Sequence, residues 1–241
     1  MRNFLLTKIR LSTYFWFFFV LFFGLSFVLP QHQFAAGALT LFSVNSFLYG
    51  FYISPILGAQ KMRIDSLHQC IRSEANALFG LVLNLKKLPD DKHKEIQEMV
   101  VKYATAKWRN GGVAGGEKEY EDLIGYCVDA KQDKDKLEET LKALVANQQN
   151  RTTFSMLAGG KVFANEWHIV AILFSITLGF IMLIDAAADG LILHVVRALL
   201  CTGLTMLIVN LVKLSTLTHK KAKQMWEPLQ KLVSTNFYRV D

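Results

Sequence analysis

The chain has 241 residues, 52% of them hydrophobic, and a formal net charge of +7 at pH 7. A single Lys, Arg, Asp or Glu falls inside its four apolar segments, which are residues 11–29, 34–57, 168–184 and 191–212. Soluble proteins do not segregate charge in this way, so the composition excludes a fully soluble protein, a disulfide scaffold and a disordered chain.

The four apolar segments predict an all-α membrane protein with four transmembrane helices in two hairpins. A helix needs about 20 apolar residues to cross the hydrocarbon core, and each segment falls within the usual range. The first segment could instead be a cleaved signal peptide, but its apolar run is longer than such peptides carry. Residues 30–33 and 185–190 are short connections, so each should close a tight hairpin.

Basic residues beside the apolar segments predict the orientation of the chain. Neither short connection contains Lys or Arg, whereas the opposite ends of all four segments do. Because basic residues stay on the cytoplasmic side, both termini and the segment between the hairpins should face the cytoplasm. This charge then lies beside anionic lipid, and nucleic-acid binding is not expected. The flanking cations are Arg2, Lys8, Arg10, Lys61, Arg63, Arg151, Lys161, Lys213, Lys220, Lys221 and Lys223.

The expected organisation has four parts, each with a distinct composition. Residues 1–58 hold an N-terminal tail and the first transmembrane hairpin, 59–165 a helical cytoplasmic segment, 166–212 the second hairpin, and 213–241 a basic cytoplasmic tail. Both hairpins are expected to lie in a plasma membrane, so the lipid bilayer is the first predicted partner.

Apolar residues recur every three or four positions beyond the second apolar segment, which predicts one buried stripe on a helix. The second transmembrane helix should therefore continue into the cytoplasm as far as Leu88-Pro89, with any kink at Pro55 or Gly58. Further helices are expected from Asp90 or Asp91, over 120–128 and over 137–148. The stripe consists of Ile64, Leu67, Ile71, Ala75, Leu78, Val82 and Leu85.

The sequence carries no pattern typical of catalysis or metal binding. Cys70, Cys127 and Cys201 have no CxxC spacing and no histidine partners at zinc spacing. The glycine-rich stretch 111–116 lacks the GK[ST] sequence and the preceding strand of a phosphate loop, so a flexible connector is expected. We therefore expect a protein that is not an enzyme and that uses no cofactor and no metal.

Small and hydroxyl-bearing residues follow helical spacing along the second apolar segment. Such a stripe lets helices pack closely, or it lines a narrow pore that has an apolar constriction. Both interpretations stay open. The pore-lining candidates are Thr40, Ser43, Ser46, Phe47, Gly50 and Ser54.

His194 and Arg197 form a polar face on the fourth apolar segment. Arg197 could extend to the outer interface and pair with Asp185 or Asp189. It could also line an aqueous pathway, where it would favour anions and His194 would respond to pH. The two aspartates would favour cations at the mouth, so ion selectivity stays open.

The stretch Arg72-Ser73-Glu74-Ala75-Asn76-Ala77-Leu78, then Leu88-Pro89, then Tyr103 and Trp108, resembles the bestrophin-like family of bacterial membrane proteins. This family has long been catalogued as a domain of unknown function. Its members place a Glu-Ala-Asn-Ala segment after one hairpin, then a Leu-Pro break, a helix ending in Tyr and Trp, and a second hairpin. The resemblance extends from about Gly37 to Val212.

This resemblance implies a homo-oligomer in the bacterial inner membrane, pentameric as in bestrophins proper. The second transmembrane helix would line the pore and continue as a cytoplasmic helix. The calcium clasp of bestrophins is not implied, because the C-terminal tail has no dense acidic run. The family-motif residues Glu74 and Asn76 are expected to make a polar packing contact, with Arg72 or another subunit as partner, or else to bind an ion.

Two functions are consistent with these observations. The first is an oligomeric, bestrophin-like ion channel that passes small ions through a pore along the second transmembrane helix. The alternative is a non-conducting membrane scaffold or sensor whose cytoplasmic helices bind a partner.

Overall fold

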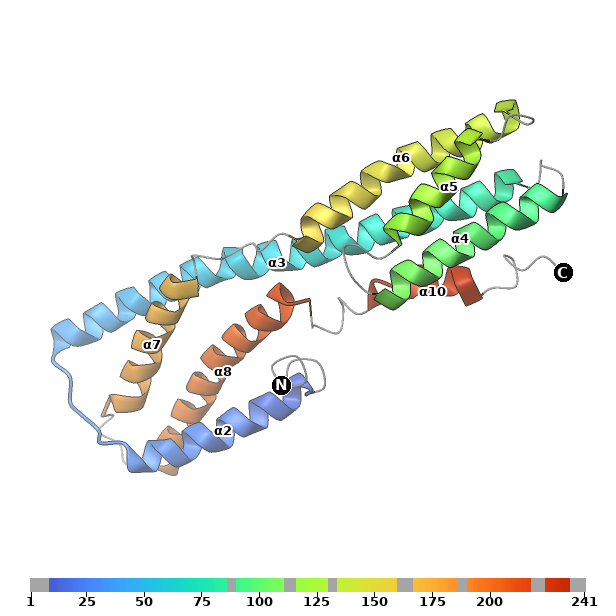
Figure 1. Ribbon diagram of the computed structural model, residues 1–241. Helices are drawn as coiled ribbons and strands as arrows, with labels where there is room; N and C mark the ends of the chain where they lie inside the picture. The colour runs from blue at the N-terminus through green and yellow to red at the C-terminus, as the bar shows by residue number, and fades with distance from the viewer. Residues whose placement is uncertain are drawn as a thin grey trace. The chain divides into compact units, whose positions relative to one another are not determined.

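The computed structural model describes residues 9–85, 90–110, 116–129, 134–159, 167–185, 190–217 and 224–234. Within these ranges the regular elements are all helices, so the predicted all-α class is confirmed there (Figure 1). The helices are α2 (Leu11–Val28), α3 (Ala36–Leu85), α4 (Asp90–Asn110), α5 (Glu117–Asp129), α6 (Lys134–Gly159), α7 (Trp167–Leu183), α8 (Leu191–Ser215) and α10 (Glu227–Ser234).

The chain forms two compact units, which are described one at a time. The first unit contains Met1–Met62 and Lys161–His219, and the second contains Arg63–Gly160 and Lys220–Asp241. The helix α3 contributes residues to both, because it is one helix of 50 residues that continues through Pro55. The expected extension of the second apolar helix is thus present as far as Leu85, while residues 86–89 lie outside the described ranges.

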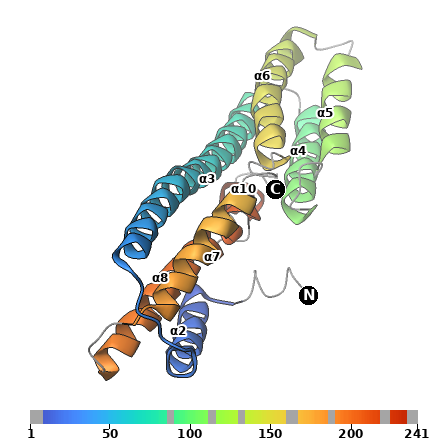
Figure 2. The same cartoon turned by 90° about the vertical axis from the view of Figure 1, so that its left-hand side faces the viewer.

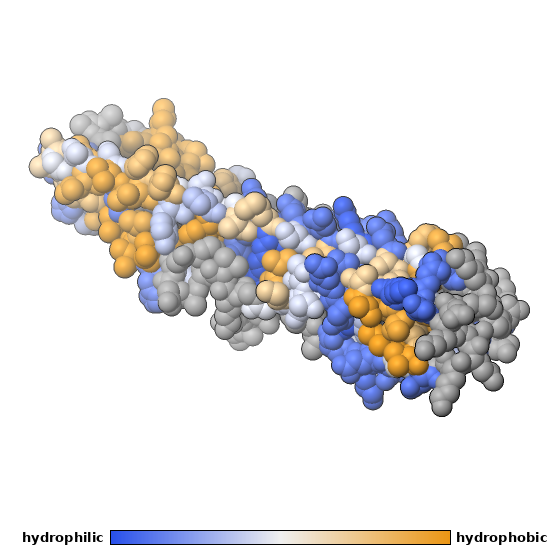
Figure 3. Space-filling model, turned by 90° about the horizontal axis from the view of Figure 1, so that it is seen from above, coloured by the Kyte–Doolittle hydropathy of each residue, from blue (hydrophilic) through white to orange (hydrophobic). Residues whose placement is uncertain are grey.

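Among the described helices, α2, α3 and α8 are long and apolar enough to cross a membrane. The helix α7 is equally apolar but has only 17 residues. Only Phe22 and Ser26 of α2 are buried, and large apolar side chains such as Trp16 and Phe17 are exposed. A helix that is apolar on all sides is typical of a membrane span, since lipid covers what protein does not. The face seen in Figure 3 shows apolar side chains gathered over these helices.

Two apolar clusters hold the first unit together. In one, Phe22 of α2 packs with Ile181 of α7 and with Ala198 and Cys201 of α8. In the other, α3 packs against α7 and α8. The members of this second cluster are Tyr49, Ile53, Ile56, Val170 and Leu211.

The pairing of helices differs from the expected first hairpin. The helix α2 packs along α8, not along α3, and α7 also packs on α8. The physical reason is the apolar surface of α7 and α8, which contributes to both clusters and so receives α2 and α3 separately. The first short connection therefore joins two helices that are not packed as a pair.

In the second unit, α4, α5 and α6 pack together beside the C-terminal part of α3 (Figure 2). The stripe predicted on α3 is buried at Leu67, Ile71 and Leu78, as its spacing requires. The expected helices 120–128 and 137–148 lie inside α5 and α6. The region expected to be a basic tail contains α10, which packs on α4 and buries Leu229 and Leu232.

Candidate functional site

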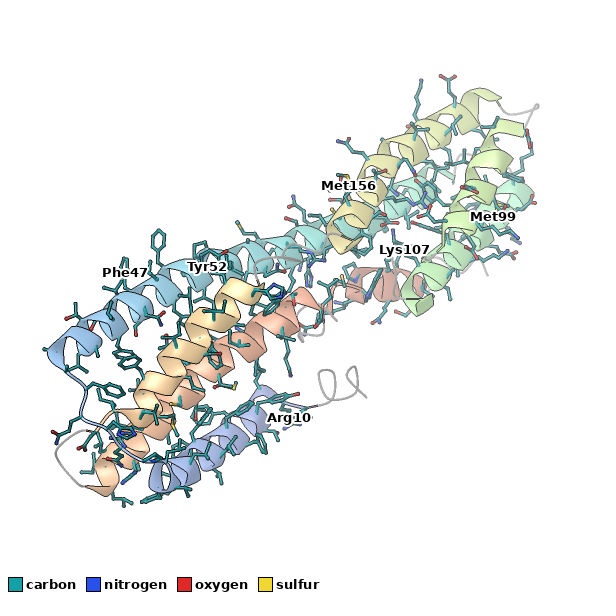
Figure 4. All side chains as sticks on the ribbon, turned by 60° about the vertical axis from the view of Figure 1, so that its left-hand side comes forward. Arg10, Phe47, Tyr52, Met99, Lys107 and Met156 are labelled. Atoms are coloured by element: carbon teal, nitrogen blue, oxygen red, sulfur yellow. The ribbon has the colours of Figure 1, made fainter. Side chains whose placement is uncertain are left out.

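Five of the six pore-lining candidates of α3 lie on its unpacked face. Thr40, Ser43, Gly50 and Ser54 are exposed, and the side chain of Phe47 is 69% exposed. No atom outside the helix backbone lies within 4 Å of the point where a Gly50 Cβ would stand. Phe47 points away from α7 (Figure 4). These exposed candidates therefore do not mediate close helix packing inside this chain.

Hydrogen bonds within α3 satisfy the exposed hydroxyls of this face. Thr40 Oγ1 donates to the carbonyl of Ala36 at 3.1 Å, and Ser43 Oγ donates to that of Leu39 at 3.0 Å. Hydroxyls bonded one turn back need neither water nor a neighbouring helix. This face can therefore meet lipid, another protomer or a narrow aqueous passage without leaving these two groups unpaired.

The opposite face of α3 packs against α7. Asn45 Nδ2 donates to Thr177 Oγ1 at 2.8 Å and to the carbonyl of Leu173 at 3.2 Å. Ser46 differs from the other candidates because it is half-buried. Its hydroxyl, like that of Tyr49, is buried without a hydrogen-bond partner among the described residues.

Arg197 lies where the two interhelical connections meet. It is only 2% exposed, and its Nη2 donates to the carbonyl of Ile184, with a longer contact of 3.5 Å to Gln31 Oε1. The backbone of His32 pairs with this same segment: its N–H donates to Leu183 at 2.8 Å, and its carbonyl accepts from Asp185 at 2.9 Å.

The expected pair of Arg197 with Asp185 is not formed, and Asp189 lies outside the described residues. The guanidinium turns instead to the carbonyl end of α7, where a cation is favoured by the helix dipole. Its Nε and Nη1 are buried without partners in the described part of the chain. Arg197 therefore ties the two connections together.

His194 faces α2. Its Nδ1 lies 3.0 Å from Ser26 Oγ, and its ring stacks on Phe27 with 4.2 Å between ring centroids. Although His194 and Arg197 are three residues apart on α8, each is occupied by a contact with a different element.

In the second unit, Glu74 is fully buried and forms an ion pair. Lys107 Nζ lies 2.7 Å from Glu74 Oε1 and 2.5 Å from Oε2, and the Tyr103 hydroxyl also donates to Oε1. Both partners come from one face of α4, since they are four residues apart. The expectation that Arg72 pairs with Glu74 is wrong, because Arg72 is exposed and Lys107 takes that place.

A second ion pair borders the first. Arg151 of α6 donates to Glu117 of α5 and to Gln148 Oε1, the latter at 2.7 Å. Its guanidinium lies 3.7 Å from the centroid of the Tyr120 ring and 5.6 Å from that of Tyr103. We call Glu74, Tyr103, Lys107, Tyr120 and Arg151 the buried polar cluster; Glu117, whose side chain is 49% exposed, lies at its edge.

Burial has the largest effect on the pKa values of Lys107, Tyr103 and Tyr120. It lowers the pKa of Lys107, an effect that the Glu74 carboxylate opposes. It also raises the pKa of Tyr103, with Glu74 acting in the same direction, and that of Tyr120. Tyr103 therefore stays protonated at neutral pH and can donate to Glu74.

A model of the bestrophin-like domain matches residues 13–219. The chain belongs to the bestrophin-like family. No curated protein and no solved structure matches it. The matched region includes the pore-lining candidates of α3, Arg197 and the whole buried polar cluster. The resemblance first indicated by Glu74–Leu78 is therefore confirmed.

Within the bestrophin-like domain, the two family-motif residues lie on different faces of α3. Glu74 points into the second unit, whereas Asn76 is exposed. No group of His, Cys, Asp or Glu side chains among the described residues could hold a metal ion. The arrangement around Glu74 joins four helices.

Local sequence does not indicate the pairing of Arg151 with Glu117, since the two residues are 34 positions apart. The spacing of Tyr103 and Lys107 was the available signal: a tyrosine and a lysine four residues apart on a helix share one face. A lysine on the buried side of a helix requires a nearby carboxylate, and Glu74 is a buried acid next to the apolar stripe of α3.

Proposed function

We propose that this membrane protein of the bestrophin-like family is a homo-oligomeric ion channel whose pore runs along the unpacked face of α3. One observation carries the proposal: Thr40, Ser43, Phe47, Gly50 and Ser54 face away from α7 and α8. Five copies of the chain, the number that the family resemblance implies, would bring this face to a common axis. Phe47 would then form an apolar constriction between hydroxyl-bearing turns.

The proposed topology has four crossings, with α7 as the shortest. Both termini and the second unit lie on the cytoplasmic side of a bacterial inner membrane, because the basic residues flank the ends of the apolar segments on that side. Small ions are the transported species, and no catalytic step is proposed.

The test is current through the reconstituted full-length protein in planar bilayers. Replacing Phe47 with Ala should widen the constriction and raise the conductance or the open probability several-fold. The matched control is Phe17→Ala on α2, because Phe17 is also exposed, at 61%, but lies outside the α3 face. Absence of current from both the wild type and Phe47→Ala would reject the channel.

The alternative is a non-conducting scaffold or sensor. It is favoured by exposed apolar side chains of the second unit, such as Val128, Val145 and Met156, which lipid would not cover in the proposed topology. The native mass of the purified protein separates the two functions. A closed ring supports conduction, whereas a monomer or dimer that passes no current supports the scaffold.

A further inference from the structure

An open groove lies in the second unit between α3 and the C-terminal segment. It has a volume of about 410 Å³. It continues into a hollow that also borders His68, Arg72 and Gln224 and adds Asp65 and Gln69. The lining residues of the groove are His68, Arg72, Gln224, Glu227, Pro228 and Lys231.

Arg72 supplies the strongest ligand-binding group of this groove. Its side chain is exposed and makes no hydrogen bond or ion pair with any residue in the described ranges. A guanidinium presents a planar fork of N–H donors that matches the oxygens of a phosphate group. The neighbouring His68 ring lies on the same face of α3, one turn earlier.

Charge in the groove favours an anion. In the groove itself, Arg72 and Lys231 face one carboxylate, that of Glu227, which Lys231 Nζ contacts at 2.9 Å, while the carboxylate of Asp65 borders the adjoining hollow. Lys231, and more weakly Arg72, lower the pKa of Glu227. The charge of the Glu227 carboxylate is thus balanced by Lys231. The guanidinium of Arg72 can therefore bind an anion.

The far wall of the groove exists only while the C-terminal segment is docked. Trp226 is buried against Phe154 of α6, with 5.6 Å between ring centroids, and Leu229 and Leu232 of α10 are buried. A ligand held between Arg72 and Gln224 would contact both walls at once. Its binding energy would therefore stabilise the docked segment.

We propose that this groove binds a phosphate group and that the bound phosphate holds the C-terminal segment against α3. The phosphate can belong to a soluble molecule or to a lipid headgroup, since both offer the same oxygens. This role is independent of conduction through the α3 face.

Calorimetric titration of the full-length protein in detergent with inorganic pyrophosphate tests the site. We expect saturable binding that Arg72→Ala weakens about tenfold or more, the loss of a charge-assisted contact. Glu227→Gln should tighten binding, because it removes the opposing charge. The matched control is Glu138→Gln, which breaks a similarly exposed ion pair on α6, with Lys142 at 2.7 Å, and should leave binding unchanged.

Hydrogen exchange of residues 224–234 tests the coupling to docking and separates the two sources. Slower exchange on adding pyrophosphate, lost in Arg72→Ala, supports a soluble phosphate. Slower exchange in phosphatidylglycerol nanodiscs than in phosphatidylcholine nanodiscs, again lost in Arg72→Ala, supports a headgroup. The proposal is overturned if neither condition slows exchange, or if Arg72→Ala behaves as the wild type in both measurements.

Discussion

Lys107 and Glu74 form a two-pronged ion pair in the interior of the second unit, with Lys107 Nζ 2.7 and 2.5 Å from the two carboxylate oxygens. The side chains are 4% and 0% exposed, so both charges have lost their water. Removing two charges from water is costly, and the pair offsets that cost only while both partners remain. This dependence makes the pair a sensitive point for mutation.

Replacing Lys107 with Met should destabilise the protein by about 3–5 kcal/mol, because Glu74 is left buried without a cation. The double variant Glu74→Leu with Lys107→Met should be less destabilised than Lys107→Met alone, since no charge is then buried unpaired. Thermal unfolding of the purified protein measures both. Lys142→Met, at an exposed pair on α6, should change stability by less than about 1 kcal/mol. Equal losses for the buried and the exposed lysine would contradict this account.

Gly116 precedes α5 with φ of +81°, and a Cβ there would lie 2.9 Å from the Tyr103 ring. Gly116→Ala should therefore destabilise the second unit by more than the roughly 1–2 kcal/mol of a left-handed backbone alone. Gly125→Ala is the control, and its effect on stability should have the opposite sign. It lies inside α5 with no atom within 4 Å of its Cβ position, so alanine should stabilise the helix by roughly 0.5–1 kcal/mol. If the unfolding midpoints of both variants move in the same direction, the backbone conformation and the close Tyr103 contact described for Gly116 are contradicted.

The stability of the second unit should fall as the pH rises from about 9 to about 11. Burial raises the pKa of the Cys127 thiol from 9.0 to about 11. Between these two pH values the Cys127 thiol loses its proton in the unfolded chain but keeps it in the folded chain. This contribution to the free energy of unfolding is therefore complete below about pH 9 and decreases as the pH rises toward about 11. Cys127→Ala should show a smaller alkaline loss in chemical unfolding, whereas Val128→Ala, an exposed neighbour, should retain the wild-type slope.

Cysteine labelling tests the proposed orientation. The natural thiols Cys70, Cys127 and Cys201 are all buried, so the folded wild type should react little. A membrane-impermeant maleimide applied to intact cells should label Gln33→Cys in the first connection but not Asn76→Cys, both at exposed positions. Permeabilised cells provide the control in which both react. Labelling of Asn76→Cys from outside would reverse the orientation.

The α3 stripe shows what local sequence can predict. Burial of one face of a long helix depends on a spacing of three and four residues, which the sequence displays directly. The same reasoning located the expected helices inside α5 and α6. It failed for α10, because the basic residues before it obscured the short apolar pattern of Leu229 and Leu232.

The partner of Glu74 shows what local sequence cannot predict. Arg72 was the nearest cation along the chain, but residues two apart on a helix face different directions. The actual partner, Lys107, lies 33 residues away on α4. Only the packing of α4 on α3 brings the two together, and the sequence of either helix alone does not specify that pairing. The α3 pore face was predictable as a stripe, while its unpacked state depended on where α7 and α8 dock.

The backbone pairing of His32 with the segment around Ile184 constrains how relatives of this chain can diverge. These bonds involve only peptide groups, so almost any side chain is tolerated there, whereas an inserted or deleted residue would shift the register. Homologues should therefore vary freely in composition at the two connections but rarely in length, and a relative that gains a residue in one connection should carry a compensating change in the other.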